Sequence, residues 1–282
     1  MPEKTSLVSS VLCIAFSIMC CSCTNSGNPQ GGSSTQSQQL VLTGSSTVAP
    51  LAMEIGKRFE SLHPGVRVDV QTGGSSRGIA DVRRGLADIG MASRALKPEE
   101  KLLAFPIARD GVCVILHRDN PVKALSNKQI VAIYSDKINN WKDVGGLDAP
   151  ITVVNKAEGR ATLEVFLHHF GFNNSMIKAD VVIGDNEQGI KTVAGNPNAI
   201  GYVSVGTAEY DFQNGVKIKL LPASRVKAST ENLANGSFPI SRPLNFVTKT
   251  KPEGLIKEFI EFAQSNQVHD LVKGLHFVPT TK

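Results

Sequence analysis

The sequence predicts an α/β fold with mainly parallel β-sheets. Short apolar runs typical of strands alternate along the chain with patterns typical of amphipathic helices, as expected when helices connect parallel strands. Three of these runs also end in a turn of Gly, Ser and Thr residues that leads directly into a helical pattern. The runs and their turns are Leu40-Val41-Leu42 into Gly44-Ser45-Ser46-Thr47, Val66-Arg67-Val68-Asp69-Val70 into Gly73-Gly74-Ser75-Ser76, and Ile151-Thr152-Val153-Val154 into Gly159-Arg160-Ala161-Thr162.

The length and composition agree with a globular protein. The 282 residues suffice for one large domain or two medium-sized ones, each able to bury a core. The hydrophobic fraction of 41% and the charged fraction of 20% exclude a disordered or fibrous chain. The net charge of +5 is not concentrated in any Lys/Arg run, so it favours small anions and predicts no patch for nucleic acid.

Helices are expected directly after each of the three turns, because apolar residues recur there at helical spacing. The apolar positions are Leu51, Ile55 and Phe59 behind Pro50, then Ile79, Val82 and Leu86, then Leu163, Phe166, Leu167 and Phe170. Further helices are predicted at residues 127–134, 189–194 and 253–265, and strands at residues 107–117, 199–205, 216–221 and 242–248. Cys113 lies in the apolar run 111–116 and is expected to be a buried core residue.

Each turn is a place where an anion can bind. The N-terminus of a helix carries unpaired backbone N–H groups and about half a positive charge, and small hydroxyl-bearing residues add further donors. Ser, Thr and Asn before a helix are also common N-caps, so a single loop of this kind has an ordinary structural explanation. Three of them in the same strand-turn-helix context favour one shared ligand site at the carboxyl ends of the strands.

The N-terminus has the features of an export signal. Lys4 precedes an apolar stretch at residues 7–19 that is too short to span a bilayer, and four of the five cysteines follow within or just after it, at Cys13, Cys20, Cys21 and Cys23. This crowding resembles a bacterial lipobox, with Cys21, or alternatively Cys23, as the lipid-modified residue; an ordinary cleaved signal peptide is the other reading. Residues 1–23 are therefore expected to form a lipoprotein signal region, and the Ser/Gln/Gly-rich residues 24–39 are expected to form a flexible tether.

An enzyme is the alternative from another class of function. Gly74-Ser75-Ser76-Arg77-Gly78 fits the G-x-S-x-G pattern of a serine hydrolase, after a strand and before a helix. Its acid and base would be Asp185 or Asp211 with His269 or His276, but no His-Gly-Gly segment supplies an oxyanion hole. The histidines also lack metal-ligand spacing, and His168 and His169 point in different directions on one helix, so neither a metal nor a cofactor is expected.

Several strings resemble one known family in order from about residue 40 to the end. They are Leu42-Thr43-Gly44-Ser45-Ser46-Thr47-Val48-Ala49-Pro50, Gly73-Gly74-Ser75-Ser76-Arg77-Gly78-Ile79, Gly85-Leu86-Ala87-Asp88-Ile89-Gly90-Met91-Ala92-Ser93-Arg94, Ile133-Tyr134-Ser135-Asp136-Lys137-Ile138-Asn139-Asn140-Trp141-Lys142-Asp143-Val144-Gly145-Gly146 and Ala199-Ile200-Gly201-Tyr202-Val203. The family is the phosphate-binding subunit of bacterial phosphate ABC importers.

The resemblance implies a two-lobed periplasmic-binding-protein fold of type II, with the ligand in a cleft between the lobes. Lobe 1 would combine residues 40–113 and 242–282, and lobe 2 would take residues 114–241. The implied function is the capture of inorganic phosphate and its delivery to a membrane permease with its ATPase. The implied protein is a monomer in the periplasm or at the outer cell surface, held by its lipid anchor. Hinge closure of the lobes would capture the ligand.

Position by position, the resemblance also implies the contacts to the anion. The implied binding residues are Ser46, Thr47, Val48 through its backbone, Ser75, Ser93, Ala161 and Thr162, with Lys156 in the place of a family arginine. Glu158 stands where the family has the carboxylate that holds this arginine. Lysine keeps the positive charge but not the two-pronged geometry of arginine.

Two further departures concern selectivity. Well-described members of the family have an aspartate where this chain has Arg94, and that carboxylate accepts the proton of hydrogen phosphate and helps to reject sulfate. They also have serine where this chain has Arg160. Arg94 and Arg160 are therefore expected to add two cations at the cleft, with Glu158 as one candidate acceptor. A binding protein for another tetrahedral oxyanion, such as sulfate, molybdate or tungstate, remains the alternative.

Overall fold

The computed structural model describes residues 38–280. The predicted signal region 1–23, with Cys21 and Cys23, and residues 24–37 of the predicted tether lie outside the described residues. The first strand begins at Gln38, so the last two residues assigned to the tether belong to it. None of the helices described is long and apolar enough to cross a membrane.

Strands and helices alternate through most of the described chain. The strands are β1 (Gln38–Gly44), β2 (Val66–Thr72), β3 (Ile89–Ala92), β4 (Leu103–His117), β5 (Thr152–Lys156), β6 (Val181–Ile183), β7 (Ala199–Ser204), β8 (Ile218–Leu220), β9 (Ser241–Thr248) and β10 (Val278–Pro279). The α-helices are α1 (Ala49–Leu62), α2 (Ser75–Arg84), α3 (Asn127–Tyr134), α4 (Ala161–Phe170), α5 (Asn186–Ala194), α6 (Val205–Gln213), α7 (Thr230–Ala234), α8 (Gly254–Ala263) and α9 (His269–Gly274). Short 3₁₀ turns are η1 (Pro98–Glu100), η2 (Trp141–Val144), η3 (Asn174–Met176) and η4 (Asn266–Val268).

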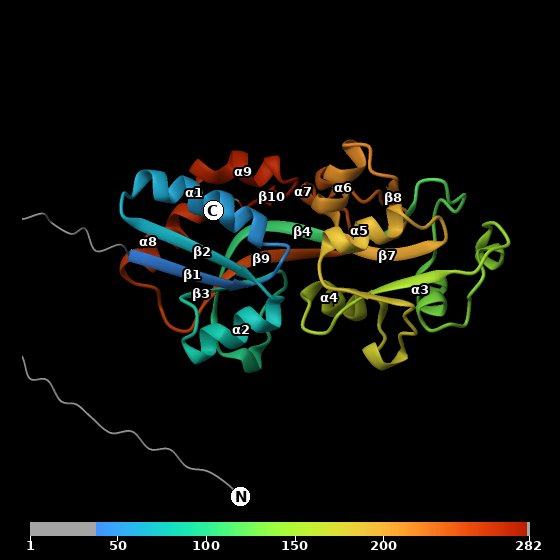
Figure 1. Ribbon diagram of the computed structural model, residues 1–282, viewed down its shortest axis with the longest axis horizontal. Helices are drawn as coiled ribbons and strands as arrows, with labels where there is room; N and C mark the ends of the chain where they lie inside the picture. The colour runs from blue at the N-terminus through green and yellow to red at the C-terminus, as the bar shows by residue number, and fades with distance from the viewer. Residues whose placement is uncertain (1–37, 281–282) are drawn as a thin grey trace, which may run out of the picture. The chain divides into compact units, whose positions relative to one another are not determined.

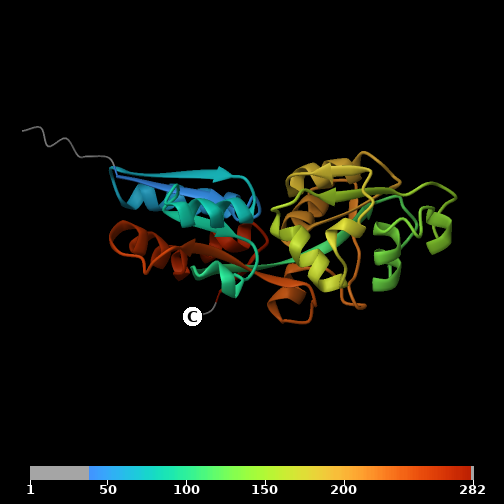
Figure 2. The same cartoon turned by 90° about the horizontal axis from the view of Figure 1, so that it is seen from below.

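The strands form a mixed sheet in the order β2-β1-β3-β9-β4-β7-β5-β6, with β8 and β10 also paired to β4. The expected parallel pairing occurs on both sides of the sheet, between β1 and its neighbours β2 and β3 and between β5 and its neighbours β6 and β7. The long strands β4 and β9 pair antiparallel with each other and with their other neighbours. This follows from the path of the chain, which crosses between two halves along β4 and returns along β9 (Figures 1 and 2).

Two large hydrophobic clusters lie on either side of this crossing. One takes its buried residues from the ranges 40–108 and 244–277, and the other from the range 112–240 together with Val278. In the first, the ring of Phe59 packs edge-on against that of Phe259 with centroids 5.1 Å apart. In the second, Phe166 of α4 stacks on Tyr202 of β7 with ring centroids 3.8 Å apart. Cys113 of β4 is a buried core residue, as predicted.

Most elements agree with the sequence patterns, and the differences have local causes. Helix α3 has the predicted bounds, whereas α5 begins three residues early because the Asp185 side chain accepts a hydrogen bond from the backbone N–H of Gln188 and caps it. Helix α6 was not predicted, because its first residue, the β-branched Val205, was assigned to the end of the preceding strand. There the Ser204 side chain accepts from the backbone N–H of Thr207 and starts a helix instead.

Candidate functional site

The three Ser/Thr-containing turns meet at one small cavity. Its volume is about 10 Å³, far below the range of about 300 to 1,000 Å³ that is usual for pockets of larger organic ligands. The lining consists of Ser45, Ser46, Thr47, Gly74, Ser75, Ser93, Lys156, Arg160, Ala161, Thr162, Gly184 and Asn186. Eight of the ten residues expected at the anion are therefore in the lining. Val48 and Arg94 are the two that are not.

The first loop leads from β1 into α1. The Ser45 hydroxyl accepts hydrogen bonds from the backbone N–H groups of Thr47 (3.2 Å) and Val48 (3.3 Å), so it takes the capping role in this turn. The side chains of Ser46 and Thr47 are thereby left for the cavity. The N–H of Val48 already has this partner and its side chain is fully buried, which is why Val48 stands behind the lining rather than in it.

The second loop brings the start of α2 close to β1 and to the third loop. A Cβ on Gly78 would lie 2.4 Å from the backbone oxygen of Thr43, so only glycine lets α2 pack this closely on β1. Gly74 has a φ of +97°, and a Cβ there would lie 2.7 Å from the backbone oxygen of Gly159 in the third loop. The Ser75 hydroxyl accepts from the backbone N–H of Ser93 at 3.1 Å rather than capping its own helix.

The third loop leads from β5 into α4. No side chain caps this helix at Arg160, so its first backbone N–H groups are left toward the cavity beside Ala161 and Thr162. Glu158 is exposed, and its carboxylate accepts from the Asn174 side chain at 2.8 Å instead of pairing with Lys156 or Arg160. No carboxylate side chain belongs to the lining of the cavity.

Arg242 of β9 lies directly behind the hydroxyls of the cavity, and the sequence analysis did not select it. Its guanidinium is paired with Asp110 of β4 at 2.8 Å, and both side chains are almost completely buried. The same guanidinium donates to the hydroxyls of Thr162 (2.9 Å), Ser93 (3.4 Å) and Thr47 (3.4 Å). The available signal was one charge of each sign within two predicted strands.

Lys156 and Asn186 complete the far side of the cavity. The Lys156 ammonium donates to the backbone oxygen of Asp185 at 2.5 Å and to the Asn186 side-chain oxygen at 3.2 Å. The pKa of Lys156 is lowered to about 7, mainly by burial; the nearby guanidinium groups of Arg242 and Arg160 contribute to the lowering, while Asp185 opposes it. Asn186 was not predicted, because a first-turn asparagine carries no signal for a ligand.

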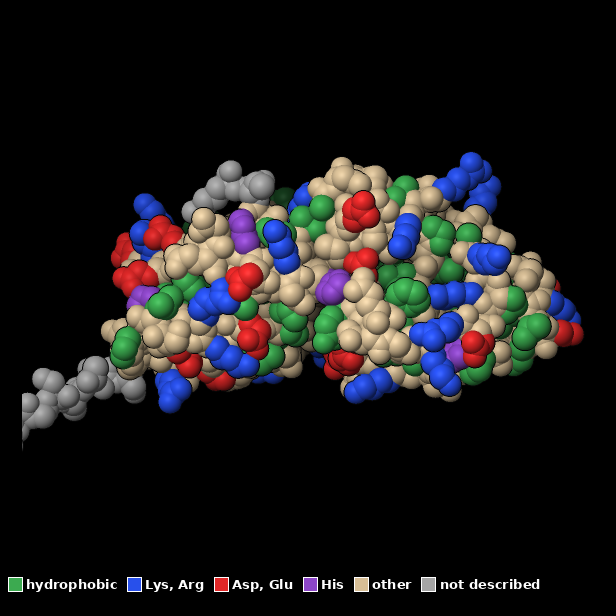
Figure 3. Space-filling view, turned by 90° about the horizontal axis from the view of Figure 1, so that it is seen from above, with side chains coloured by type: hydrophobic (Ala, Val, Ile, Leu, Met, Phe, Trp, Pro, Cys, Tyr) green, Lys and Arg blue, Asp and Glu red, His purple; other side chains and the backbone are tan. Residues whose placement is uncertain are grey.

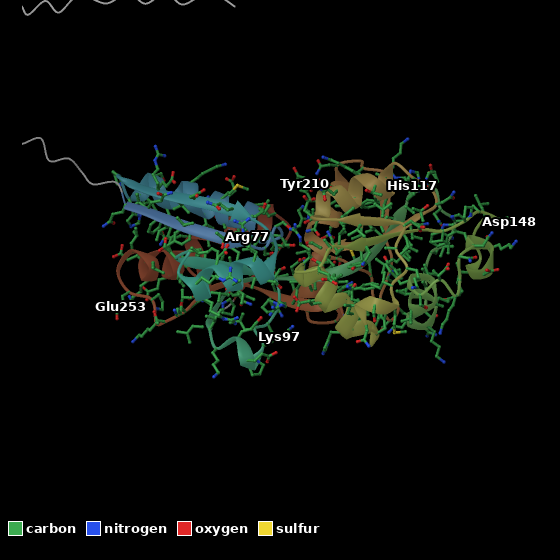
Figure 4. The ribbon with its side chains drawn as sticks, turned by 60° about the horizontal axis from the view of Figure 1, so that its bottom comes forward. Arg77, Lys97, His117, Asp148, Tyr210 and Glu253 are labelled. Atoms are coloured by element: carbon green, nitrogen blue, oxygen red, sulfur yellow. The ribbon has the colours of Figure 1, made fainter. Side chains whose placement is uncertain are left out.

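Arg94 was expected at the anion, but the structure places it outside the lining of the cavity. Its guanidinium is held outside the lining by Glu100 of η1 at 2.7 Å and by Glu164 of α4 at 3.2 Å. Lys97 also reaches Glu164, at 3.0 Å, and Figure 4 shows it near the border between the two halves. Arg94 therefore joins the segment after β3 to α4, because two carboxylates outside the cavity pair with it.

The remaining candidates for chemistry do not assemble in the described residues. Ser76 is exposed, and its hydroxyl has the Glu164 carboxylate, at 3.5 Å, as its hydrogen-bond partner rather than a histidine. No group of three or more His, Cys, Asp or Glu residues suited to a metal ion is found within residues 38–280. On the face seen in Figure 3, Lys and Arg side chains are spread over both halves among acidic ones.

The fold and the donor-lined cavity define a binding protein of the PBP superfamily. Residues 29–267 match the model of the PBP superfamily domain. Two solved structures are similar over 86% of this chain and 100% of their own. One, a phosphate ABC transporter substrate-binding protein of Clostridium perfringens with bound phosphate, is 34% identical with a TM-score of 0.80. The other, an ABC-type phosphate transport receptor of Vibrio cholerae, is 28% identical with a TM-score of 0.71.

Curated relatives narrow the family further. The phosphate-binding protein PstS of Staphylococcus haemolyticus is 30% identical over 78% of this chain and 74% of its own length. PstS of Bacillus subtilis is 27% identical over 99% of this chain and 95% of its own length. The chain belongs to the family of the PstS phosphate-binding proteins.

Proposed function

We propose that this chain captures inorganic phosphate in the cavity between its two halves and delivers it to an ABC permease with its ATPase. The observation that carries the proposal is the convergence of hydroxyls, helix N-termini and the cations Lys156 and Arg160 on one small cavity. Such a lining offers many donors to a compact anion. The names of the relatives, which describe phosphate binding and phosphate transport, support the same ligand.

The proposed contacts come from the side chains and helix N-termini of the lining. The proposed binding residues are Ser46, Thr47, Ser75, Ser93, Lys156, Arg160, Ala161 and Thr162. A hydrogen bond to a charged group contributes about 1.5 to 3 kcal/mol, whereas micromolar affinity requires only about 8 kcal/mol in total. Several such bonds and two cations therefore suffice even after desolvation.

The two halves are proposed to be lobes that close over the anion, lobe 1 of residues 40–113 and 242–282 and lobe 2 of residues 114–241. The change from one hydrophobic cluster to the other within β4, between Ala108 and Val112, supports this division, as does the change between Ile240 and Leu244 around the start of β9. Contacts between the halves surround the cavity, among them the hydrogen bond from the backbone N–H of Ser76 to the backbone oxygen of Gly159.

Export and anchoring are part of the same proposal. The chain is proposed to act in the periplasm or at the outer cell surface, as a lipoprotein anchored through Cys21 or Cys23, and as a monomer without catalytic activity. The apolar stretch and the crowded cysteines at the N-terminus support the anchor. The relatives, which are binding and transport proteins by name, support a role without catalysis.

Calorimetry of the lipid-free chain against phosphate, sulfate, molybdate and arsenate tests the proposal. Phosphate bound more tightly than sulfate supports it, and a preference for sulfate overturns it. The second candidate, a carrier of another oxyanion, is favoured by one specific observation, namely that the lining of the cavity contains no carboxylate side chain to read a ligand proton.

Substitutions test the residues. Thr47→Ala, Ser75→Ala and Thr162→Ala should each weaken phosphate binding by about ten- to a hundred-and-fiftyfold while the chain stays folded, because each removes one donor to a charged group. Titration calorimetry gives the affinity and circular dichroism the fold. Unchanged affinity in all three variants would disprove the site.

A further inference from the structure

The directions of the hydroxyl hydrogens can be derived from the partners of each oxygen. A Ser or Thr hydroxyl donates one hydrogen bond and accepts up to two. The Thr47 oxygen accepts from the side chain of Asn186 at 3.2 Å and from Arg242 at 3.4 Å. The Ser93 oxygen accepts from Ser45 at 3.0 Å and from Arg242 at 3.4 Å. Both oxygens have their accepting positions filled, so both hydroxyls have only a hydrogen to offer to the cavity.

The hydroxyls of Ser75 and Thr162 also have a hydrogen to donate to the cavity. Ser75 accepts from the backbone N–H of Ser93 at 3.1 Å, and Thr162 accepts from Arg242 at 2.9 Å. Neither hydroxyl donates to a protein acceptor within residues 38–280, so the hydrogen of each remains for a ligand, and each oxygen keeps one accepting position. Arg242 thus acts as a positioning residue, because its N–H groups orient three of the four hydroxyls.

Three other polar side chains of the lining offer no acceptor to a bound anion. Lys156 in its charged form and Arg160 carry only donors. The Asn186 side-chain oxygen already accepts from Lys156 at 3.2 Å and from the backbone N–H of Ser204 at 3.4 Å. An oxyanion that carries a proton would therefore find many donors for its oxygens but no acceptor among these side chains for its own O–H group.

Ser46 differs from Ser75 and Thr162 because no donor within residues 38–280 holds its hydroxyl. Within the described part of the chain its hydroxyl has no hydrogen-bond partner, and it lies between the small cavity and an adjoining groove whose lining it shares with Thr47 and Thr207. An unpartnered hydroxyl can turn, so it can either donate to a bare oxygen or accept from an O–H group.

We propose that Ser46 accepts the proton of hydrogen phosphate, while the hydroxyls oriented by Arg242, Asn186 and the Ser93 backbone donate to its oxygens. The inference rests on the proposed function, since it assigns the residue that reads the protonation of that ligand. A hydroxyl that can turn also donates to an anion without a proton. The wild-type chain is therefore expected to bind sulfate measurably, although less tightly than phosphate.

Ser46→Asp tests the proposal by replacing the hydroxyl with a permanent acceptor. The adjoining groove provides room for the longer side chain. Hydrogen phosphate can still donate its proton to the carboxylate, whereas sulfate meets only a like charge. We expect the ratio of phosphate to sulfate affinity to rise by about tenfold or more, since one unmatched polar contact changes affinity by that order. Affinity for phosphate is measured by calorimetry and affinity for sulfate by displacement of phosphate.

Thr207→Asp is the matched control, because it adds the same charge in the groove without facing the small cavity. It should weaken both anions by the same factor. Ser46→Ala provides a second variant that needs no extra space. It should lower the ratio of phosphate to sulfate affinity, because the ligand O–H is left without an acceptor while bare oxygens keep the other donors.

The outcomes separate this inference from the function on which it rests. A wild-type chain that does not bind phosphate overturns both. A wild-type chain that binds phosphate but not sulfate overturns only the assignment of Ser46, as does an equal loss of both anions in Ser46→Asp together with an unchanged ratio in Ser46→Ala. A raised ratio in the first variant and a lowered ratio in the second support it.

Discussion

Replacing Arg242 by methionine tests whether one buried side chain supports both the fold and the site. The guanidinium contacts the Asp110 carboxylate at 2.8 Å and donates to the hydroxyls of Thr47, Ser93 and Thr162. Methionine fills similar space with none of these donors. In Arg242→Met, the fully buried Asp110 carboxylate keeps only the backbone N–H of Gly206, at 3.2 Å.

The cost to the fold follows from the burial of this pair. Removing one partner of a buried ion pair destabilises a protein by about 3 to 5 kcal/mol, because the other charge remains buried and unpaired. For a chain of this length, each 1 kcal/mol lowers the melting temperature by about 2 to 4 °C. Arg242→Met should therefore melt about 6 to 20 °C below the wild type.

The double variant Asp110→Asn/Arg242→Met separates stability from binding. Asparagine keeps an acceptor for the N–H of Gly206 and carries no charge, so most of the lost stability should return. The three hydroxyls remain without the donor that orients them. Phosphate affinity should stay reduced by about a hundredfold or more, the equivalent of one or two hydrogen bonds to a charged group.

Thermal and urea unfolding give the stability of the three proteins, and titration calorimetry gives their affinity for phosphate. The reasoning is refuted if Arg242→Met is as stable as the wild type, because the buried Asp110 carboxylate would then not need its partner for stability. It is equally refuted if the double variant binds phosphate as tightly as the wild type, because the guanidinium would then not orient the hydroxyls.

Two further predictions concern charge around the cavity. Burial lowers the pKa of Lys156 to about 7, so in the free protein the side chain loses its proton as pH rises through that value, whereas a bound anion favours the charged form. One pH unit above this pKa, the wild type should take up nearly one proton more per phosphate bound than Lys156→Met, measured by calorimetry in buffers of different ionisation enthalpy; equal uptake would contradict the assignment. Glu164→Gln removes the carboxylate on α4 that pairs with Arg94 and Lys97 of the other half. Because this contact joins the two halves, its loss should weaken phosphate binding about two- to tenfold, mainly through faster release of phosphate, which stopped-flow measurements detect. The control Glu261→Gln breaks only the exposed pair with Lys257 on α8 and should bind normally, and an equal effect of both changes would exclude a specific role for Glu164.

The elements that present the site could be predicted because their signals are local. Apolar residues at helical spacing and the Gly, Ser and Thr residues of the turns predicted α1, α2 and α4, each beginning directly after its loop. The alternation of strands and helices predicted the fold class, and the ordered strings predicted the family. These signals depend on neighbours within a few turns of backbone, which any sequence displays directly.

The roles of Arg94 and Arg242 could not be predicted from the sequence. Both are cations near the expected cleft in the sequence, yet Arg94 pairs with Glu100 and Glu164 outside the cavity lining, whereas Arg242 stands behind the hydroxyls. Glu100 is only six residues after Arg94, but Glu164 lies on α4 and Asp110 is 132 residues before Arg242. A nearby glutamate does not by itself show which arginine faces the hydroxyls.

The chain order of strands, turns and helices was thus readable in the amino acids alone, and with it the residue types that surround a small anion. The folded molecule alone determined which side chains share the cavity, which way their hydroxyl hydrogens point, and that β4 and β9 run antiparallel between the two halves. The reason is physical, since propensity and spacing act along the backbone, whereas the direction of a buried hydrogen bond depends on partners that only tertiary packing brings within about 3 Å.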